Sequence, residues 1–297
     1  MLFPPMKFDH RRPRHLPHLD HTDILLMGLS PLGSNGWIEP DGEAGRYHLN
    51  KLAQRRRYGD RVYNALPESL PAQRELAECL LPYLLREHGD CYRREGARLY
   101  CLPGGFRAPV TSAEPLWTAS LWVADDLVIM EPRGDTHCLT AASLCAASHW
   151  RLEDKIGGTL GDIHAVIPGF NATLLPRVER FFRHLRVEHP VVRFNWSLQR
   201  GGRLNQRNDD AAQAADAELY YRVERQSLRR LPDTGAVIFT IRVYLHPLLQ
   251  LQAMGPALPK LFQAIESNPL VLQQYKGFDR LEGALQPYRA LARGAAQ

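Results

Sequence analysis

The sequence predicts an α+β fold in which an antiparallel sheet is flanked by N- and C-terminal helices. Three observations support this prediction. Apolar residues recur at helical spacing near both ends of the 297-residue chain, and they alternate every second residue in several stretches between those ends. Turn residues separate neighbouring alternating stretches, and strands that are joined by short turns pair antiparallel.

The N-terminal part of the chain is predicted to be an arm followed by helices. Residues 1–23 are rich in His, Pro and Arg and are interpreted as an extended arm, in which flexible surface histidines are favoured over a metal site. A short apolar segment and a loop are expected at 22–41. Helical spacing appears at 49–66, with a basic face, and at 71–88, where Pro82 is expected to kink or split the helix. The histidines of the arm are His10, His15, His18 and His21.

The middle of the chain is predicted to supply the strands. Residues 116–132 hold two β-type runs around Asp125 and Asp126, which are interpreted as the turn of a hairpin. A third strand is expected at 137–148. After it we predict a helix that becomes a Gly/Pro-rich connection, an amphipathic helix, a strand and a polar loop, at residues 151–171, 174–187, 191–198 and 202–213.

A second hairpin is predicted in VERQSLRRLPDTGAVIFTIRVY, residues 223–244. Pro-Asp-Thr-Gly at 232–235 has the composition of a turn. The first half carries Glu224 and several arginines, so the paired strands bring a carboxylate and several guanidinium groups to one sheet. The second half alternates like a strand with one buried face, formed by Val237, Phe239, Ile241 and Val243.

The C-terminal segments LPKLFQAIES, PLVLQQYKGF and RLEGALQPYRALAR are helical by the same spacing. Two hairpin-rich halves with helices inserted between them are typical of a PAS-like sheet. We therefore predict that residues 24–297 form a single elaborated PAS-like domain behind the arm of residues 1–23.

Composition excludes several classes of protein. The five cysteines show no CxxC spacing, which argues against a disulfide framework and against a thiolate metal site. No stretch approaches the roughly 20 apolar residues of a membrane helix, and no signal peptide is evident, so a cytoplasmic protein without a membrane partner is expected. The net charge of +5 fits an anionic cofactor, an acidic protein or nucleic acid. The basic run at 55–57 is interpreted as a solvated helix face rather than a DNA site.

Nucleotide-binding and hydrolase motifs are absent, but the stretch IHAVIPGFN, residues 163–171, draws attention to His164. This histidine lies between apolar residues, just before a Pro-Gly turn. One interpretation is a core histidine with a satisfied hydrogen bond. The other is a metal or haem ligand, because haem iron takes a neutral imidazole and the turn would hold the ring in position.

Arginines on two or three of the predicted strands form a second candidate set. Arginine forks pair bidentately with carboxylates. The set therefore has two interpretations: internal ion pairs, for example with Glu224 or Asp233, or a site for two cofactor carboxylates such as haem propionates. Its members are Arg193, Arg225, Arg229, Arg230 and Arg242.

Seven segments together resemble the haem-containing subunit of haem-dependent oxidative N-demethylases. They are MGLSPLGSNGWIEPD, LWVADDLVIME, WRLEDKIG, IHAVIPGFN, RFNWSL, RVERQSLRRLPDTGAVIFTIRVY and the late YKG, spread from residue 27 to residue 277. The resemblance implies a PAS-type sheet around haem b. It also implies oxygen-dependent demethylation of a small secondary amine such as dimethylamine, which yields the primary amine and formaldehyde. Electrons would come from flavin and ferredoxin modules on partner chains in a hetero-oligomer, with no nucleic-acid partner.

The resemblance also implies roles for individual residues. His164 becomes the expected haem-iron ligand, and the cofactor-binding set is Arg193, Arg225, Arg242 and Asn195. Glu224 and Tyr221 are the expected catalytic residues, which would steer protons or hold the amine cation.

Two departures from the family pattern concern the ligand. Val166 stands where the family usually has a proline, and Ala147-Ser148-His149 replaces a Pro-Ser pair, so His149 is a rival ligand. The alternative function is a PAS-like haem or gas sensor without catalysis, and a third is a nucleic-acid binder that uses residues 55–57.

Overall fold

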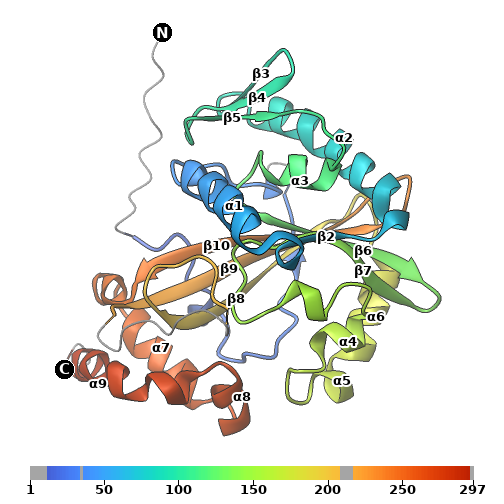
Figure 1. Cartoon of the computed structure of the whole chain (residues 1–297). Coiled ribbons are helices and arrows are strands. Elements are labelled where there is room, and N and C mark those ends of the chain that lie inside the picture. Colours follow the sequence, from blue (N-terminus) through green and yellow to red (C-terminus); the bar gives the residue numbers. More distant parts are fainter. Residues whose placement is uncertain (1–11, 34–35, 208–216, 295–297) are drawn as a thin grey trace.

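The computed structural model describes residues 12–33, 36–207 and 217–294, and a seven-stranded sheet forms its centre (Figure 1). The strand order is β1-β8-β9-β10-β6-β7-β2, so β10 is the middle strand, and every neighbouring pair is antiparallel. The strands are β1 (Ser30–Pro31), β2 (Tyr63–Ala65), β6 (Asp126–Arg133), β7 (Thr136–Ser143), β8 (Val191–Arg200), β9 (Leu219–Arg230) and β10 (Val237–Pro247).

Helices pack around this sheet. In the view of Figure 1 the N-terminal helices α1–α3 lie above the sheet with a small second sheet, β3-β4-β5, whereas α4–α6 lie below it. The helices are α1 (Ala44–Tyr58), α2 (Leu70–Glu87), α3 (Pro115–Ser120), α4 (Leu160–His164), α5 (Phe170–Thr173), α6 (Leu175–His184), α7 (Ala257–Glu266), α8 (Leu270–Tyr275) and α9 (Phe278–Gly294). The small sheet consists of β3 (Tyr92–Glu95), β4 (Arg98–Cys101) and β5 (Phe106–Pro109). No helix of the described ranges has the length and apolarity that a membrane crossing requires.

The register divides the side chains between two faces of the large sheet, because residues directly opposite each other on antiparallel strands share a face. Asn195, Glu224 and Val243 are opposite one another; their face carries the apolar cluster beneath α4 and α6 and is called the α4–α6 face. Arg225 and Arg242 are opposite each other on the other face. There β6, β7 and β10 pack against α1–α3, and this is called the α1–α3 face.

The predicted α+β class with a large antiparallel sheet is confirmed, and so are the strands at 137–148 and 191–198 and the second hairpin. Helix α2 continues through Pro82 and is not split. The interpretation of Asp125 and Asp126 as the turn of a hairpin is wrong. Residues 115–120 form α3, residues 121–125 form a turn and a bend, Asp126 begins β6, and the turn of the β6–β7 hairpin contains Gly134 with a φ of 60°.

The N-terminal arm is partly described. Residues 1–11, and with them His10, lie outside the described residues. The expected flexible surface position is wrong for His18, which is buried: its Nδ1 lies 2.7 Å from the Tyr221 hydroxyl, and its Nε2 lies 2.9 Å from the carbonyl of Ala257.

Asp125 is a buried acid whose two carboxylate oxygens have no hydrogen-bond partner among the described residues. Burial raises the pKa of this carboxyl to about 6, although Arg242 and Arg225 pull it downward. When the pKa of a carboxyl is higher in the folded than in the unfolded protein, the group stabilises the fold at low pH. This stabilisation is complete below the unfolded-state pKa and is lost as the pH rises through the folded-state pKa of about 6.

Asp125→Asn is therefore expected to flatten the pH dependence of stability. A shift from 3.8 to about 6 corresponds to a decline of up to about 3 kcal/mol in the free energy of unfolding between acidic pH and pH 8. Urea titrations from pH 3 to pH 8 measure this decline, most of which should fall between about pH 4 and pH 6. The control is Asp135→Asn, in the exposed β6–β7 turn, which should keep the wild-type profile. An equally steep profile in Asp125→Asn would contradict the prediction.

Candidate functional site

The α4–α6 face is partly open at the centre of the sheet. Phe239 and Ile241 of the middle strand are only partly buried, whereas Ile238, Thr240 and Arg242 on the opposite face are buried. The face predicted to be buried is thus buried at Val237 and Val243 but only partly at Phe239 and Ile241. Phe239 and Ile241 therefore keep some solvent access in the middle of the seven-stranded sheet, and this part of the face is called the open space below.

A fixed carboxylate lies on the floor of this space. Glu224 on β9 accepts hydrogen bonds from Arg222 Nε at 3.0 Å, Asn195 Nδ2 at 3.1 Å and Gln226 Nε2 at 3.0 Å. Burial opposes ionisation of Glu224, but the Arg222 charge and the Asn195 hydrogen bond outweigh it and lower its pKa. Glu224 is thus a permanent anion held in one position.

Lys276, just after α8, reaches the same floor from the C-terminal part of the chain. Its Nζ donates to Asn195 Oδ1 at 2.7 Å and to the carbonyl of Trp196 at 3.0 Å. Burial lowers the pKa of Lys276 to about 8, although the charge of Glu224 raises it. Sequence reasoning did not single out this lysine. The only signal for it was its place in the late YKG segment.

His164 ends α4, whose first turn is fixed by a capping box between Thr159 and Asp162. Its Nδ1 lies 2.8 Å from the carbonyl of Leu160, and its ring stacks on Phe170 with centroids 4.4 Å apart. A carbonyl only accepts, so Nδ1 carries the proton. Burial lowers the pKa of His164, which favours the neutral ring. Within the described ranges nothing bonds to Nε2, whose lone pair is thus free, as in histidines that bind metals.

Arg193 on β8 belongs to this side of the sheet. Its Nη2 donates to the carbonyl of Leu26 at 3.1 Å, and its buried Nε has no partner among the described residues. Its charge acts on both neighbours: it lowers the pKa of His164 and interacts favourably with Glu224. The structure therefore brings together His164, Arg193, Asn195 and Glu224, and it leaves one guanidinium donor for an added anion.

The other three sequence-predicted residues lie on the opposite face. Arg225 Nε is 3.2 Å from Glu39, and Arg242 Nη2 contacts both carboxylate oxygens of Asp41 at 2.9 and 2.8 Å. These are internal ion pairs, with partners other than the Glu224 and Asp233 that the sequence suggested. Tyr221 is bonded to His18, as described above. None of the three side chains reaches the open part of the α4–α6 face.

The rival ligand His149 is placed differently. It is exposed, its backbone has a φ of 54°, and its amide donates to the carbonyl of Gln206 at 2.7 Å. An exposed ring offers no enclosed wall for a cofactor, so the geometry favours His164 over His149 as the ligand.

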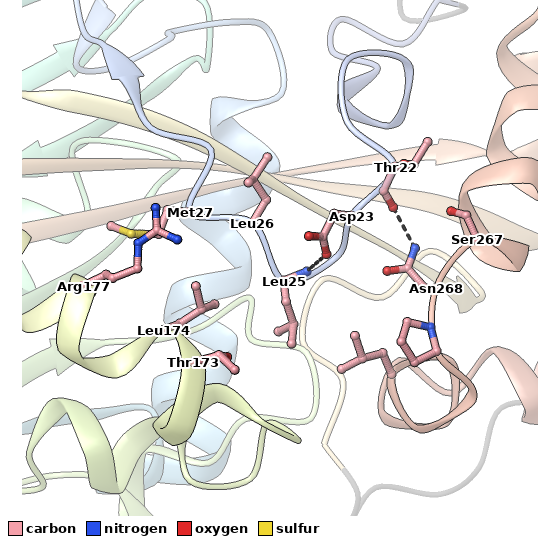
Figure 2. Close-up of a pocket in the computed structure, with 12 residues that line it drawn as sticks. Thr22, Asp23, Leu25, Leu26, Met27, Thr173, Leu174, Arg177, Ser267 and Asn268 are labelled. Atoms are coloured by element: carbon pink, nitrogen blue, oxygen red, sulfur yellow. Dashed lines mark hydrogen bonds between the residues drawn. The ribbon is translucent and has the colours of Figure 1, made fainter.

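A cavity of about 560 Å³ lies beside the N-terminal segment that Arg193 contacts, and this volume lies within the roughly 300–1,000 Å³ of cofactor and ligand pockets. Figure 2 shows Leu25, Leu26 and Met27 between Arg177 of α6 on one side and Ser267 and Asn268 on the other. Leu26 links this cavity to Arg193, because the residue belongs to the cavity lining and its carbonyl accepts from Arg193.

Comparison with known protein families agrees with this geometry. The family described as haem-dependent oxidative N-demethylase, alpha subunit-like, matches residues 28–286. The match covers most of the chain and includes His164, Arg193, Glu224 and Lys276. The resemblance found in the sequence motifs is thereby confirmed. The chain belongs to the haem-dependent oxidative N-demethylase alpha subunit-like family.

Proposed function

We propose that this protein is a PAS-like, haem b-binding oxygenase subunit that removes a methyl group from a small secondary amine such as dimethylamine. The products would be the primary amine and formaldehyde. The observation that carries the proposal is His164, whose Nδ1 is occupied and whose Nε2 has no partner among the described residues. It lies beside a partly open sheet face that holds a buried anion and an arginine whose Nε likewise lacks a described partner.

The residues of the α4–α6 face fit a haem. His164 would ligate the iron through Nε2, Phe239 and Ile241 would contact the apolar ring, and the free Nε of Arg193 would pair with a propionate. The chain has no CxxCH motif for covalent attachment, which supports haem b. Arg225 and Arg242 are not part of this proposed site, because they lie on the other face of the sheet, where they pair with Glu39 and Asp41. Bound haem would supply the one-electron and oxygen chemistry that amino-acid side chains lack.

Glu224 is the residue proposed to hold the substrate. Its carboxylate accepts three hydrogen bonds, and a carboxylate has about four acceptor positions. One position is thus left for the N–H of a dialkylammonium ion. We assign no direct contact to Tyr221, which lies on the other face.

The proposed electron source is a partner chain with flavin and ferredoxin modules. The sequence contains no ferredoxin cysteine set and no dinucleotide-binding loop, so electrons for the haem would enter from outside this chain. The protein would then work in a hetero-oligomer or in a transient complex with its reductase.

Turnover with a competent reductase tests the proposal. The haem-loaded protein, NADPH, a flavin/ferredoxin reductase and dimethylamine should consume oxygen and release formaldehyde in equal amounts. Oxygen uptake without formaldehyde for any small methylamine would overturn the proposed function. A protein that binds haem but turns over no amine would instead support the sensor alternative.

Glu224→Gln is expected to lower kcat/KM for dimethylamine about 10- to 100-fold, the loss of one charge-assisted hydrogen bond of about 1.5–3 kcal/mol. Because the amide keeps the shape of the side chain, haem content should be unchanged. Steady-state formaldehyde release measures the effect. The control is Glu282→Gln, which changes an exposed residue of α9 and should leave kcat/KM at the wild-type value. An equal kcat/KM in the two variants would contradict the role of Glu224.

A further inference from the structure

Four arginines form a strip along α6 and the turn that follows it: Arg177, Arg180, Arg183 and Arg186. All four are exposed, and among the described residues none of their side chains forms an ion pair or hydrogen bond. Exposed arginines elsewhere, such as Arg93 and Arg133, do pair with carboxylates. Only Glu179 and Glu188 offset the charge of this strip locally. The strip, called the α6 strip below, is thus a concentrated positive surface.

The α6 strip is held in place by the opposite side of its helix. Phe182 is buried in the core beneath the sheet. Arg230 on β9 donates from Nε to the carbonyl of Leu185 at 2.6 Å and also bonds the carbonyl of Phe182. The end of the helix is therefore fastened to the sheet. A fixed helix presents its charges without an ordering cost on binding.

The α6 strip lies next to the proposed haem site. His164 stacks on Phe170 of α5, and Leu174 is both the C-cap of α5 and the N-cap of α6. Met27, Arg177 and Arg180 line a hollow of about 490 Å³ on the strip. Met27 and Arg177 also line the cavity of Figure 2. A molecule bound on the strip would thus be close to the His164 side of the site.

The surroundings favour a protein over a nucleic acid. The loop after His164 exposes Val166, and α8, which lines the far side of the cavity, exposes Leu270 and Val271; their exposed fractions are 59, 74 and 51%. Protein interfaces combine such apolar residues with arginines. Nucleic acids are bound mainly through phosphate contacts, which exposed aliphatic side chains do not make.

We propose that the α6 strip is the docking surface for an acidic electron-donor protein of the [2Fe–2S] ferredoxin type. The proposal rests on the proposed function. In such a complex one electron would pass from the reduced cluster to ferric haem, so the cluster would be oxidised by one electron and the iron reduced to the ferrous state. No bond is formed or broken. Opposite charges raise the rate of encounter about 10- to 1,000-fold at low salt.

The test compares two double variants with the same change of charge. Arg180→Glu/Arg183→Glu reverses the centre of the strip. Arg56→Glu/Arg280→Glu reverses two exposed arginines on α1 and α9 that also lack partners among the described residues. Surface changes of this kind alter stability little. Stopped-flow absorbance in the Soret region measures anaerobic reduction of the haem by a reduced [2Fe–2S] ferredoxin of acidic isoelectric point.

At an ionic strength of about 0.02 M the strip variant should be reduced at least about tenfold more slowly than the wild type, and the control variant about as fast as the wild type. High salt should remove the difference. Dithionite, a small reductant, should reduce all three equally. If the strip variant binds haem and is reduced at the wild-type rate, the docking proposal is wrong but the proposed function is unaffected. A wild type without a Soret band would overturn the proposed function, and docking with it.

A final experiment tests whether the strip binds a nucleic acid or a membrane instead of a protein. Binding of a labelled DNA duplex or of phosphatidylserine vesicles is measured by fluorescence for the same variants. If the strip variant loses either binding while its reduction by ferredoxin stays at the wild-type rate, the strip belongs to that partner and the docking proposal is wrong.

Discussion

His164→Ala is expected to remove the Soret band while leaving a folded protein. The substitution deletes an imidazole whose Nε2 has no partner among the described residues, so haem loses its proposed iron ligand. The structural loss is one hydrogen bond to Leu160 and one ring stack on Phe170, or about 1–3 kcal/mol together. Absorption spectra of the oxidised and reduced protein measure haem binding, and circular dichroism measures the fold.

A matched control exists on α6. His184 also donates from Nδ1 to the carbonyl four residues earlier, that of Arg180, at 2.7 Å. His184→Ala thus removes the same local bond without touching the site, and it should keep full haem content. His164→Gly supplemented with imidazole should recover the Soret band, since the free ligand can enter the vacated space.

Three results would contradict the assignment of His164. A normal Soret band in His164→Ala would exclude it as a ligand, and loss of the band in His149→Ala instead would identify the rival. A collapsed fold in His164→Ala would support the interpretation as a core histidine.

Arg242→Met is expected to lower the free energy of unfolding by about 3–5 kcal/mol, the usual cost of removing one partner from a buried ion pair. Arg242 and Asp41 are both buried, and the variant leaves the Asp41 carboxylate without its partner. It also removes the cation that lowers the pKa of Asp125. Urea denaturation at pH 7 measures the change. Haem content per folded molecule should stay as in the wild type.

The control for Arg242→Met is Arg289→Met, whose carboxylate partners Glu266 and Glu282 are exposed; it should cost no more than about 1 kcal/mol. Asp41→Asn combined with Arg242→Met should cost less than the sum of the two single changes, because the pair is then removed as a unit. Unchanged stability with reduced haem affinity would show that Arg242 binds a propionate after all.

The sequence was sufficient for the hairpins and for the α+β class because these depend on local spacing and turn composition. It could not identify the open face, since both faces of β10 carry apolar residues and only the packing of α4–α6 decides which remains accessible. It misplaced the strand start at Asp126, because the apolar run before it fits a strand as well as the short helix α3. It also passed over β3–β5, which are short and rich in charge.

The arginines show a second limit. Spacing placed Arg193, Arg225 and Arg242 on neighbouring strands, which the structure confirms. Their partners come from segments 167 to 201 residues away in the chain, such as Leu26 and Asp41, and no local pattern reports such pairings. Which arginine is free and which is paired therefore became visible only in the folded chain.

Residues 14–41 contact residues that lie far away in the sequence, and this has a consequence for biosynthesis. Asp41 pairs with Arg242, and the carbonyl of Thr22 accepts from Asn268, across 201 and 246 residues. At about 5–20 residues per second, a ribosome needs roughly 10–50 s to make so long a stretch of chain. The N-terminal segment is synthesised before its partners Arg242 and Asn268, so its contacts with them form late. We therefore expect the wall that Leu26 contributes to be completed only after most of the protein has been synthesised.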